Sequence, residues 1–251
     1  MYGIHNVNGE VSECSAALPR AAAMPPSMPG IEAAALRYSA ALNTVVPLIR
    51  QAHAYYANRI TYTGDKMAQG RLLHPQLIPA FDNFTAAHRA FSDELGRQQD
   101  AATEAFLVRA RNDPNQVVEF HLKNDQLMSR RIIRLTRGWR VSNRGELSGI
   151  DLNELAPQVQ QYERGLNELQ RAMFTQPQQS ARISGLPSYL TFCRTYLAQL
   201  QRLVGRLQTG ETFNRAELRM MSLRFGYSVQ GSPEAVNRAY NDAVNAYNRL
   251  R

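Results

Sequence analysis

The sequence predicts an all-α fold, an elongated antiparallel helical bundle that includes a coiled-coil-like hairpin. Leu, Ala, Gln, Arg and Glu dominate the 251 residues, and valine and isoleucine never form a long run, which favours helix over sheet. Apolar residues alternate at steps of three and four over 152–173 and again over 186–207. Two such seams joined by a short polar linker are typical of an antiparallel hairpin of helices.

The chain is expected to divide into a flexible lead, residues 1–29, and one helical-bundle domain, residues 30–251. The lead contains four prolines and no repeating apolar face, which is typical of a tether. No apolar stretch approaches the roughly 18 residues that a membrane span needs. The first residues show no apolar run either, so no signal peptide is visible. A cytoplasmic protein and a trimmed mature form both fit these observations.

Two helices are predicted in the first half of the domain. The first runs from about residue 31 to residue 58, and Pro47 should kink it. The second begins at His74 or Pro75 and extends to about residue 111. His88 falls on the apolar stripe of this second helix, with no carboxylate or second histidine at ligand spacing, so we expect a core histidine rather than a metal ligand.

The segment 55–84 between these helical patterns mixes aromatic residues, two glycines and a His-Pro pair. It resembles the signature of the YiiG-like family of bacterial envelope lipoproteins (domain of unknown function 3829) through Tyr55-Tyr56, Tyr62, Gly64-Asp65-Lys66, Gly70, Leu73-His74-Pro75 and Phe81 to Phe84. The resemblance implies an all-helical domain displayed in the bacterial cell envelope or periplasm, and it brings no catalytic residues. Members of the family usually begin with a signal peptide that ends in a lipid-modified cysteine, and this chain shows neither.

Four residues of this segment, Tyr62, Asp65, Lys66 and His74, are candidate binding residues. Gly64 should end the preceding helix, and Asp65 is placed to cap the turn that follows. The proline after His74 favours an extended Leu73-His74 junction. The alternative is a plain helix-loop-helix connection whose aromatic side chains pack inside the bundle.

The third predicted helix, residues 114–141, is unusually basic. Four arginines recur at or near helical spacing and form a candidate stripe for binding an anionic partner: Arg130, Arg134, Arg137 and Arg144. Guanidinium groups pair with phosphate or carboxylate oxygens and stay charged at any working pH. The stripe therefore suits nucleic acid, anionic lipid headgroups or an acidic protein. The alternative is that these arginines pair with acids on neighbouring helices, such as Glu146, Asp151, Glu154 and Glu163.

The rest of the chain follows the helical pattern. Residues 142–150 are expected to form a loop before the coiled-coil hairpin, in which Cys193 falls on the apolar seam. A short helix over 214–225 carries Arg215, Arg219 and Arg224 opposite Leu218, Met221 and Phe225. Ser232 is placed to cap a last helix with Pro233 at its first position. The outer face of this helix carries Asn237, Asn241, Asn245 and Asn248.

These patterns predict a non-catalytic protein. The sequence contains no GxSxG, P-loop, HExxH or CxxC motif, so we expect no enzyme activity, no cofactor and no metal site. The favoured interpretation is an envelope-associated binding or scaffolding protein whose partner is a protein or an anionic surface. One alternative is a cytosolic binder of nucleic acid or phosphate through the stripe, although the stripe lacks interleaved aromatics and a recognised motif. Another alternative is an envelope inhibitor or immunity protein that neutralises a toxin.

Overall fold

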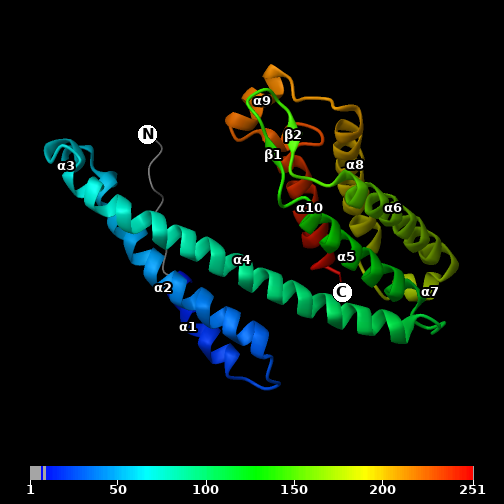
Figure 1. The fold of residues 1–251 in the computed structure, drawn as a ribbon. Helices are drawn as coiled ribbons and strands as arrows, with labels where there is room; N and C mark the ends of the chain where they lie inside the picture. Colours follow the sequence, from blue (N-terminus) through cyan, green and yellow to red (C-terminus); the bar gives the residue numbers. More distant parts are fainter. Residues whose placement is uncertain (1–6, 8–9, 251) are drawn as a thin grey trace. The chain divides into compact units, whose positions relative to one another are not determined.

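The computed structural model describes residues 7 and 10–250, and helices make up nearly all of their regular structure (Figure 1). The all-α prediction is therefore confirmed. Contacts divide the chain into two compact units, residues 1–101 and 102–251, where the sequence analysis expects a single domain from residue 30. The division follows the apolar residues, because they form separate core clusters before and after the boundary. Helix α4 (Ala68–Ala110) contributes to both units.

The first unit contains α1 (Glu10–Ala22), α2 (Pro29–Ala57), α3 (Arg59–Gly64) and α4 as far as residue 101. Helix α1 packs on α2, and the buried Ser39 hydroxyl donates a hydrogen bond to the Ser15 carbonyl at 2.7 Å. Several small side chains of α2, among them Ala34 and Ala41, are buried. Residues 10–22 are thus an ordered helix and not part of a flexible lead. Residues 1–6 and 8–9 of that expected lead lie outside the described residues.

Helix α4 begins at Ala68, several residues before the expected start at His74 or Pro75, and Pro75 and Pro79 lie inside it. The predicted extended Leu73-His74 junction is therefore wrong. Each internal proline removes one backbone hydrogen bond, and apolar packing offsets that loss: the Leu73 side chain is 2% exposed in a cluster with two residues of α2, Ala52 and Tyr55.

The prediction for His88 is also wrong, because its side chain is exposed. Its ring lies 5.5 Å from the Tyr38 ring of α2 and 6.1 Å from the Phe84 ring. The apolar stripe of α4 therefore forms an aromatic group with Tyr38 of α2 in which His88 is exposed.

The second unit is built on four helices, α5 (Val117–Leu135), α6 (Leu152–Thr175), α8 (Leu186–Thr209) and α10 (Pro233–Tyr247), with the short α7 (Pro177–Ala181) between α6 and α8. Their inward faces form one core, and α6 packs directly against α8. The predicted seams supply the fully buried side chains of this core, including Leu155, Tyr162, Leu166, Leu169, Leu186 and Leu200. Cys193 is buried on the seam, as expected.

Helix α5 ends at Leu135, not at residue 141, and the chain continues into an antiparallel hairpin of β1 (Arg140–Val141) and β2 (Leu147–Ser148). Arg140 pairs with Ser148 and Val141 with Leu147. Gly149 explains part of this departure, because its φ of +82° favours glycine and a Cβ there would lie 2.1 Å from the Gly138 carbonyl oxygen. The expected loop 142–150 is therefore largely a β-hairpin.

The last part of the chain forms α9 (Arg215–Ser222), the 3-10 helix η1 (Gly226–Ser228) and α10. The Ser232 hydroxyl accepts a hydrogen bond from the Ala235 backbone N–H at 3.1 Å, so the predicted cap of α10 is confirmed. The four asparagines of the outer face are exposed, also as expected. Across the residues that the structure describes, no helix combines the length and the apolar character required to cross a bilayer.

Candidate functional site

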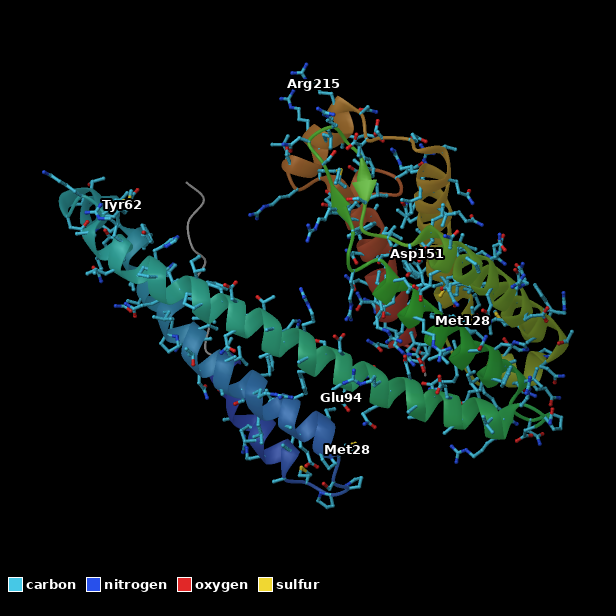
Figure 2. The ribbon with its side chains drawn as sticks, in the orientation of Figure 1. Met28, Tyr62, Glu94, Met128, Asp151 and Arg215 are labelled. Carbon is cyan, nitrogen blue, oxygen red and sulfur yellow. The ribbon has the colours of Figure 1, made fainter. Side chains whose placement is uncertain are left out.

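Three tyrosines meet at the turn between α2 and α4, in the segment that the sequence analysis singles out. The Tyr55 and Tyr56 rings are 4.7 Å apart, and Tyr62 of α3, labelled in Figure 2, lies 5.8 Å from the Tyr56 ring. Gly70 leaves room for them, because a Cβ at that position would lie 2.3 Å from the Tyr56 hydroxyl oxygen. The turn is therefore packed through aromatic side chains against the glycine backbone of α4.

Asp65 holds this turn together. The Tyr55 hydroxyl donates a hydrogen bond to Asp65 Oδ1 at 2.7 Å, and the Gln69 backbone N–H donates to Oδ2 at 3.1 Å. Both bonds favour the ionised carboxylate and lower the pKa of Asp65, with the Tyr55 bond as the larger cause. The expected capping role of Asp65 is confirmed, because its carboxylate accepts a hydrogen bond from the backbone N–H of Gln69 in the first turn of α4.

The other two candidates of this segment, Lys66 and His74, have exposed side chains. Lys66 and Met67 both have positive φ angles, 54° and 63°, which non-glycine residues rarely adopt. The structure thus brings Tyr62 and Asp65 together around Tyr55, while Lys66 and His74 are at the surface. This arrangement matches the helix-loop-helix alternative, in which the aromatic residues of the segment serve packing.

The candidate arginine stripe does not lie along one helix. Arg130 and Arg134 belong to α5, Arg137 follows its C-terminal end, and Arg144 lies in the turn of the β-hairpin. The Arg130 guanidinium donates to the Thr103 hydroxyl at 3.0 Å on the last part of α4, and the neighbouring Arg131 forms an ion pair with Glu104. The α5 end of the predicted stripe therefore contacts the last part of α4.

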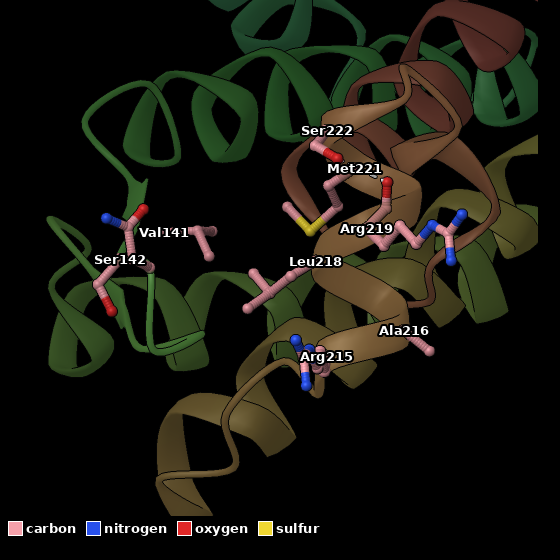
Figure 3. Close-up of a pocket in the computed structure, with 9 residues that line it drawn as sticks. Val141, Ser142, Arg215, Ala216, Leu218, Arg219, Met221 and Ser222 are labelled. Atoms are coloured by element: carbon pink, nitrogen blue, oxygen red, sulfur yellow. Dashed lines mark hydrogen bonds between the residues drawn. The ribbon is translucent and has the colours of Figure 1, made fainter.

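An open groove of about 980 Å³ lies between the β-hairpin and α9 in the second unit. Val141, Leu218 and Met221 supply its apolar wall, and Figure 3 shows Leu218 and Met221 projecting from α9 toward the side on which Val141 lies. Its polar lining comes from Ser142, Asn143, Ser222, Arg215 and Arg219, and Ala216 completes the groove. Both of these arginines are exposed, and Arg215 extends from the outer end of α9 in Figure 2. We call this feature the hairpin–α9 groove.

A buried arginine on α8 positions the α9 wall of the groove. Arg206 is 2% exposed, and its guanidinium donates to Glu217 Oε1 on α9 at 2.5 Å and to the Gln230 carbonyl at 3.2 Å. It also lies 4.3 Å from the centre of the Phe213 ring. Glu217 Oε2 in turn accepts the Asn214 N–H at 2.8 Å, which completes a capping box at the start of α9.

The β-hairpin, which forms the opposite wall of the groove, is bonded to the connection between α8 and α9. The Phe213 backbone N–H donates to the Gly145 carbonyl in the hairpin turn at 2.9 Å. Because α9 has no buried residue of its own, these polar contacts set its position beside the hairpin. The groove is therefore held on one side by Arg206 of α8 and on the other by Phe213 of the α8–α9 connection.

A second polar feature, Asp125, lies in the core of the second unit. Its side chain is completely buried, and neither carboxylate oxygen has a hydrogen-bond partner among the described residues. Burial raises the pKa of Asp125 well above its ordinary value, and burial raises the pKa of the nearby Cys193 thiol to about 11. Cys193 is consequently a poor nucleophile. In the part of the chain that the structure describes, no three His, Cys, Asp or Glu side chains gather as a metal site would need.

The groove residues were only partly visible from the sequence. The spacing of Arg215 and Arg219, with Leu218 and Met221 on the opposite face, was apparent, but nothing in it indicated that the hairpin would lie alongside. In the sequence, Asp125 is the single acid between Lys123 and Arg144, and no local pattern indicates that it is buried. Its burial depends on α6 and α8, which are distant in sequence.

A family model described as "Protein of unknown function (DUF3829)" matches residues 1–249. No curated protein and no solved structure matches the chain.

Proposed function

The chain belongs to the DUF3829 family, whose description names no activity, and from the site we propose a non-catalytic binding protein. Its ligand is an anionic amphiphile, a molecule or surface that joins a negatively charged group to an apolar body. The hairpin–α9 groove is the binding site. The observation that carries the proposal is the combination of Leu218, Met221 and Val141 with the exposed Arg215 and Arg219 around one open groove.

Each part of the groove suits one part of such a ligand. Apolar side chains gain free energy when a hydrocarbon group removes their surface from water. The Arg215 guanidinium offers charged donors to phosphate, sulfate or carboxylate oxygens, and two such bonds form at once when the geometry is bidentate. Methionine adapts to ligands of irregular shape because its side chain is unbranched and flexible, which favours a class of ligands over a single rigid one.

The groove is favoured over the arginine stripe as the centre of binding. Arg130 is bonded to Thr103 and Arg131 to Glu104, so part of the stripe serves contacts within the unit. Arg144, in the hairpin turn next to the groove-lining Ser142 and Asn143, remains a candidate contributor. Binding of a purely polar polyanion, such as nucleic acid, leaves the apolar wall of the groove unexplained.

The test is isothermal titration calorimetry, in which dodecyl phosphate is added to the full chain below the critical micelle concentration of dodecyl phosphate. Binding should weaken about tenfold in Arg215→Gln, which removes one charge-assisted contact, and also in Leu218→Ser. Arg164→Gln, at an exposed position of α6, is the matched control and should bind as the unchanged protein does. Absence of binding, or equal binding by all variants, would refute the proposed function.

The cell-envelope location belongs to the proposal as well. It is supported by the resemblance of segment 55–84 to envelope lipoproteins. Fractionation of the native host, with protease added to intact cells and to spheroplasts, tests it. Protection of the protein until the inner membrane is lysed would contradict an envelope location.

A further inference from the structure

Four large apolar side chains are gathered at the surface where α9 ends and η1 begins. Met220, Leu223, Phe225 and Tyr227 are between 40% and 54% exposed, within eight consecutive residues. Singly exposed apolar residues are common on protein surfaces, whereas a contiguous group indicates a contact surface. These residues lie beside the groove but do not line it.

Basic side chains surround this group. Between Phe213 and Tyr227 the sequence contains three arginines, two of them Arg219 and Arg224, and Glu217 is the single acid. The Arg238 guanidinium of α10 lies 4.4 Å from the centre of the Tyr227 ring.

Residues 214–238 contain four arginines and two acids, Glu217 and Glu234. Glu217 is turned inward to Arg206. The carboxylate of Glu234 is exposed and lies beside Gly226. The balance of exposed charge around the apolar group is thus positive.

The backbone that carries the group is strained. The Phe225 N–H donates to the Met220 carbonyl at 2.9 Å and the Arg224 N–H to the Met221 carbonyl at 3.1 Å, which is the pattern that closes a helix around a left-handed residue. That residue is usually glycine, but here it is Arg224, with a φ of 66°.

We propose that this surface, which we call the α9–η1 tip (Met220, Leu223, Phe225 and Tyr227 with Arg219, Arg224 and Arg238), docks the protein onto an anionic lipid bilayer. The inference rests on the proposed function and names the bilayer as the source of the anionic amphiphile. Leu223 and Phe225 enter the boundary between headgroups and acyl chains, and the arginines contact lipid phosphates. The hairpin–α9 groove, on the same helix, is then positioned at the membrane surface.

A bilayer fits the tip better than a folded acidic protein. The four apolar side chains of the tip are 40% to 54% exposed and do not line the groove, so they project from the surface instead of forming a pocket that could receive a partner's side chain. Aromatic rings and arginines with long apolar stems are the residues that occupy the headgroup region of membranes. A short amphipathic helix with basic residues on its polar face is typical of interfacial binding.

The test is sedimentation of the full chain with vesicles of phosphatidylcholine alone and with vesicles in which about a third of the lipid is phosphatidylglycerol. Binding is expected only to the anionic vesicles. The double variant Leu223→Ser/Phe225→Ser should lose about tenfold or more in affinity, since two half-exposed apolar side chains no longer enter the bilayer. Arg219→Gln should lose about fivefold. There are two matched controls on α6, and both should bind as the unchanged protein does. One is Phe174→Ser, at a residue that is 78% exposed, and the other is Arg164→Gln.

The outcomes separate this inference from the proposed function. Binding of dodecyl phosphate without binding of anionic vesicles overturns membrane docking and leaves the groove as the site of a soluble ligand. Vesicle binding that is equal in the tip variants and in the Phe174→Ser control also overturns it. Absence of both kinds of binding in the unchanged protein refutes both proposals. Urea unfolding of each variant identifies any loss of binding that results from loss of folding.

Discussion

Replacing Asp125 with asparagine should change how the stability of the protein depends on pH. The carboxyl group is completely buried on α5, and a Cβ added to Gly165 of α6 would lie 2.4 Å from its Oδ1. Tyr162, Tyr189 and Cys193, from α6 and α8, lie close enough to interact with it electrostatically. None of these neighbours is a cation, so the group is stabilised in its protonated form.

The sign of the effect follows from the direction of the shift. Burial raises the pKa of Asp125 in the folded protein, while in the unfolded chain it is about 3.9. Between these two values the folded state binds more protons than the unfolded state, so stability falls as the pH rises. The loss is about 1.4 kcal/mol for each pH unit in that window. The asparagine side chain has nearly the same shape but no proton to lose, so the Asp125→Asn variant should lack this slope.

The assay is urea unfolding at pH 4.5, 5.5 and 6.5, with circular dichroism as the measure of the folded fraction. The free energy of unfolding of Asp125→Asn, relative to the unchanged protein, should rise with pH, by up to about 1.4 kcal/mol per pH unit. A constant offset of about 1–3 kcal/mol is expected in addition, because a buried amide without partners is itself costly. Glu154→Gln, at an exposed position of α6, controls for removal of one charge. Parallel pH profiles for Asp125→Asn and the unchanged protein would show that Asp125 is ionised when folded, and would refute the reasoning.

Three further substitutions test the packing of the two units. Gly165→Ala should lower the free energy of unfolding by about 1–3 kcal/mol, because the new Cβ meets the Asp125 carboxylate. This loss of stability should disappear when Asp125 is also replaced by alanine. Equal losses with and without Asp125 would exclude this contact as the cause. Arg206→Met should cost about 3 kcal/mol in urea unfolding, whereas Arg202→Met, which removes an exposed ion pair with Glu211, should cost less than about 1 kcal/mol. Lys66→Gly should raise the midpoint of thermal unfolding, because it relieves about 1 kcal/mol of strain from the left-handed backbone conformation at this position. An unchanged or lower midpoint would contradict this strain.

The helices of this protein could be predicted because their signal is local. Apolar residues at steps of three and four identified both seams of the second unit, and Ser232 followed by Pro233 identified the start of α10 within one residue. Such patterns depend only on neighbours along the chain. The same rule failed at Pro75, since the packing of Leu73 against α2 keeps the helix intact through two prolines.

The hairpin and the groove could not be predicted because they depend on contacts between distant segments. The arginine-rich helical pattern continues through Trp139 to Val141 in the sequence, but the backbone of Gly138 approaches Gly149 and the helix ends at Leu135. The Phe213 N–H bond to Gly145 joins residues 68 positions apart. Arginines that looked equivalent in sequence were thereby separated into Arg130, which contacts Thr103, and Arg144, which lies in the hairpin turn.

The contrast between Arg206 and the arginines of α9 indicates why binding is assigned to this end of the second unit. Arg206 is buried and fully engaged with backbone carbonyls, Glu217 and Phe213, so its cost of burial is offset and it contributes to the fold. Arg215 and Arg219 are exposed on a helix that buries none of its side chains. Helix α9 adds no residue to the core, but a buried arginine and a capping box fix its position. Its exposed side chains are therefore held in place by the fold and available for contact with a ligand.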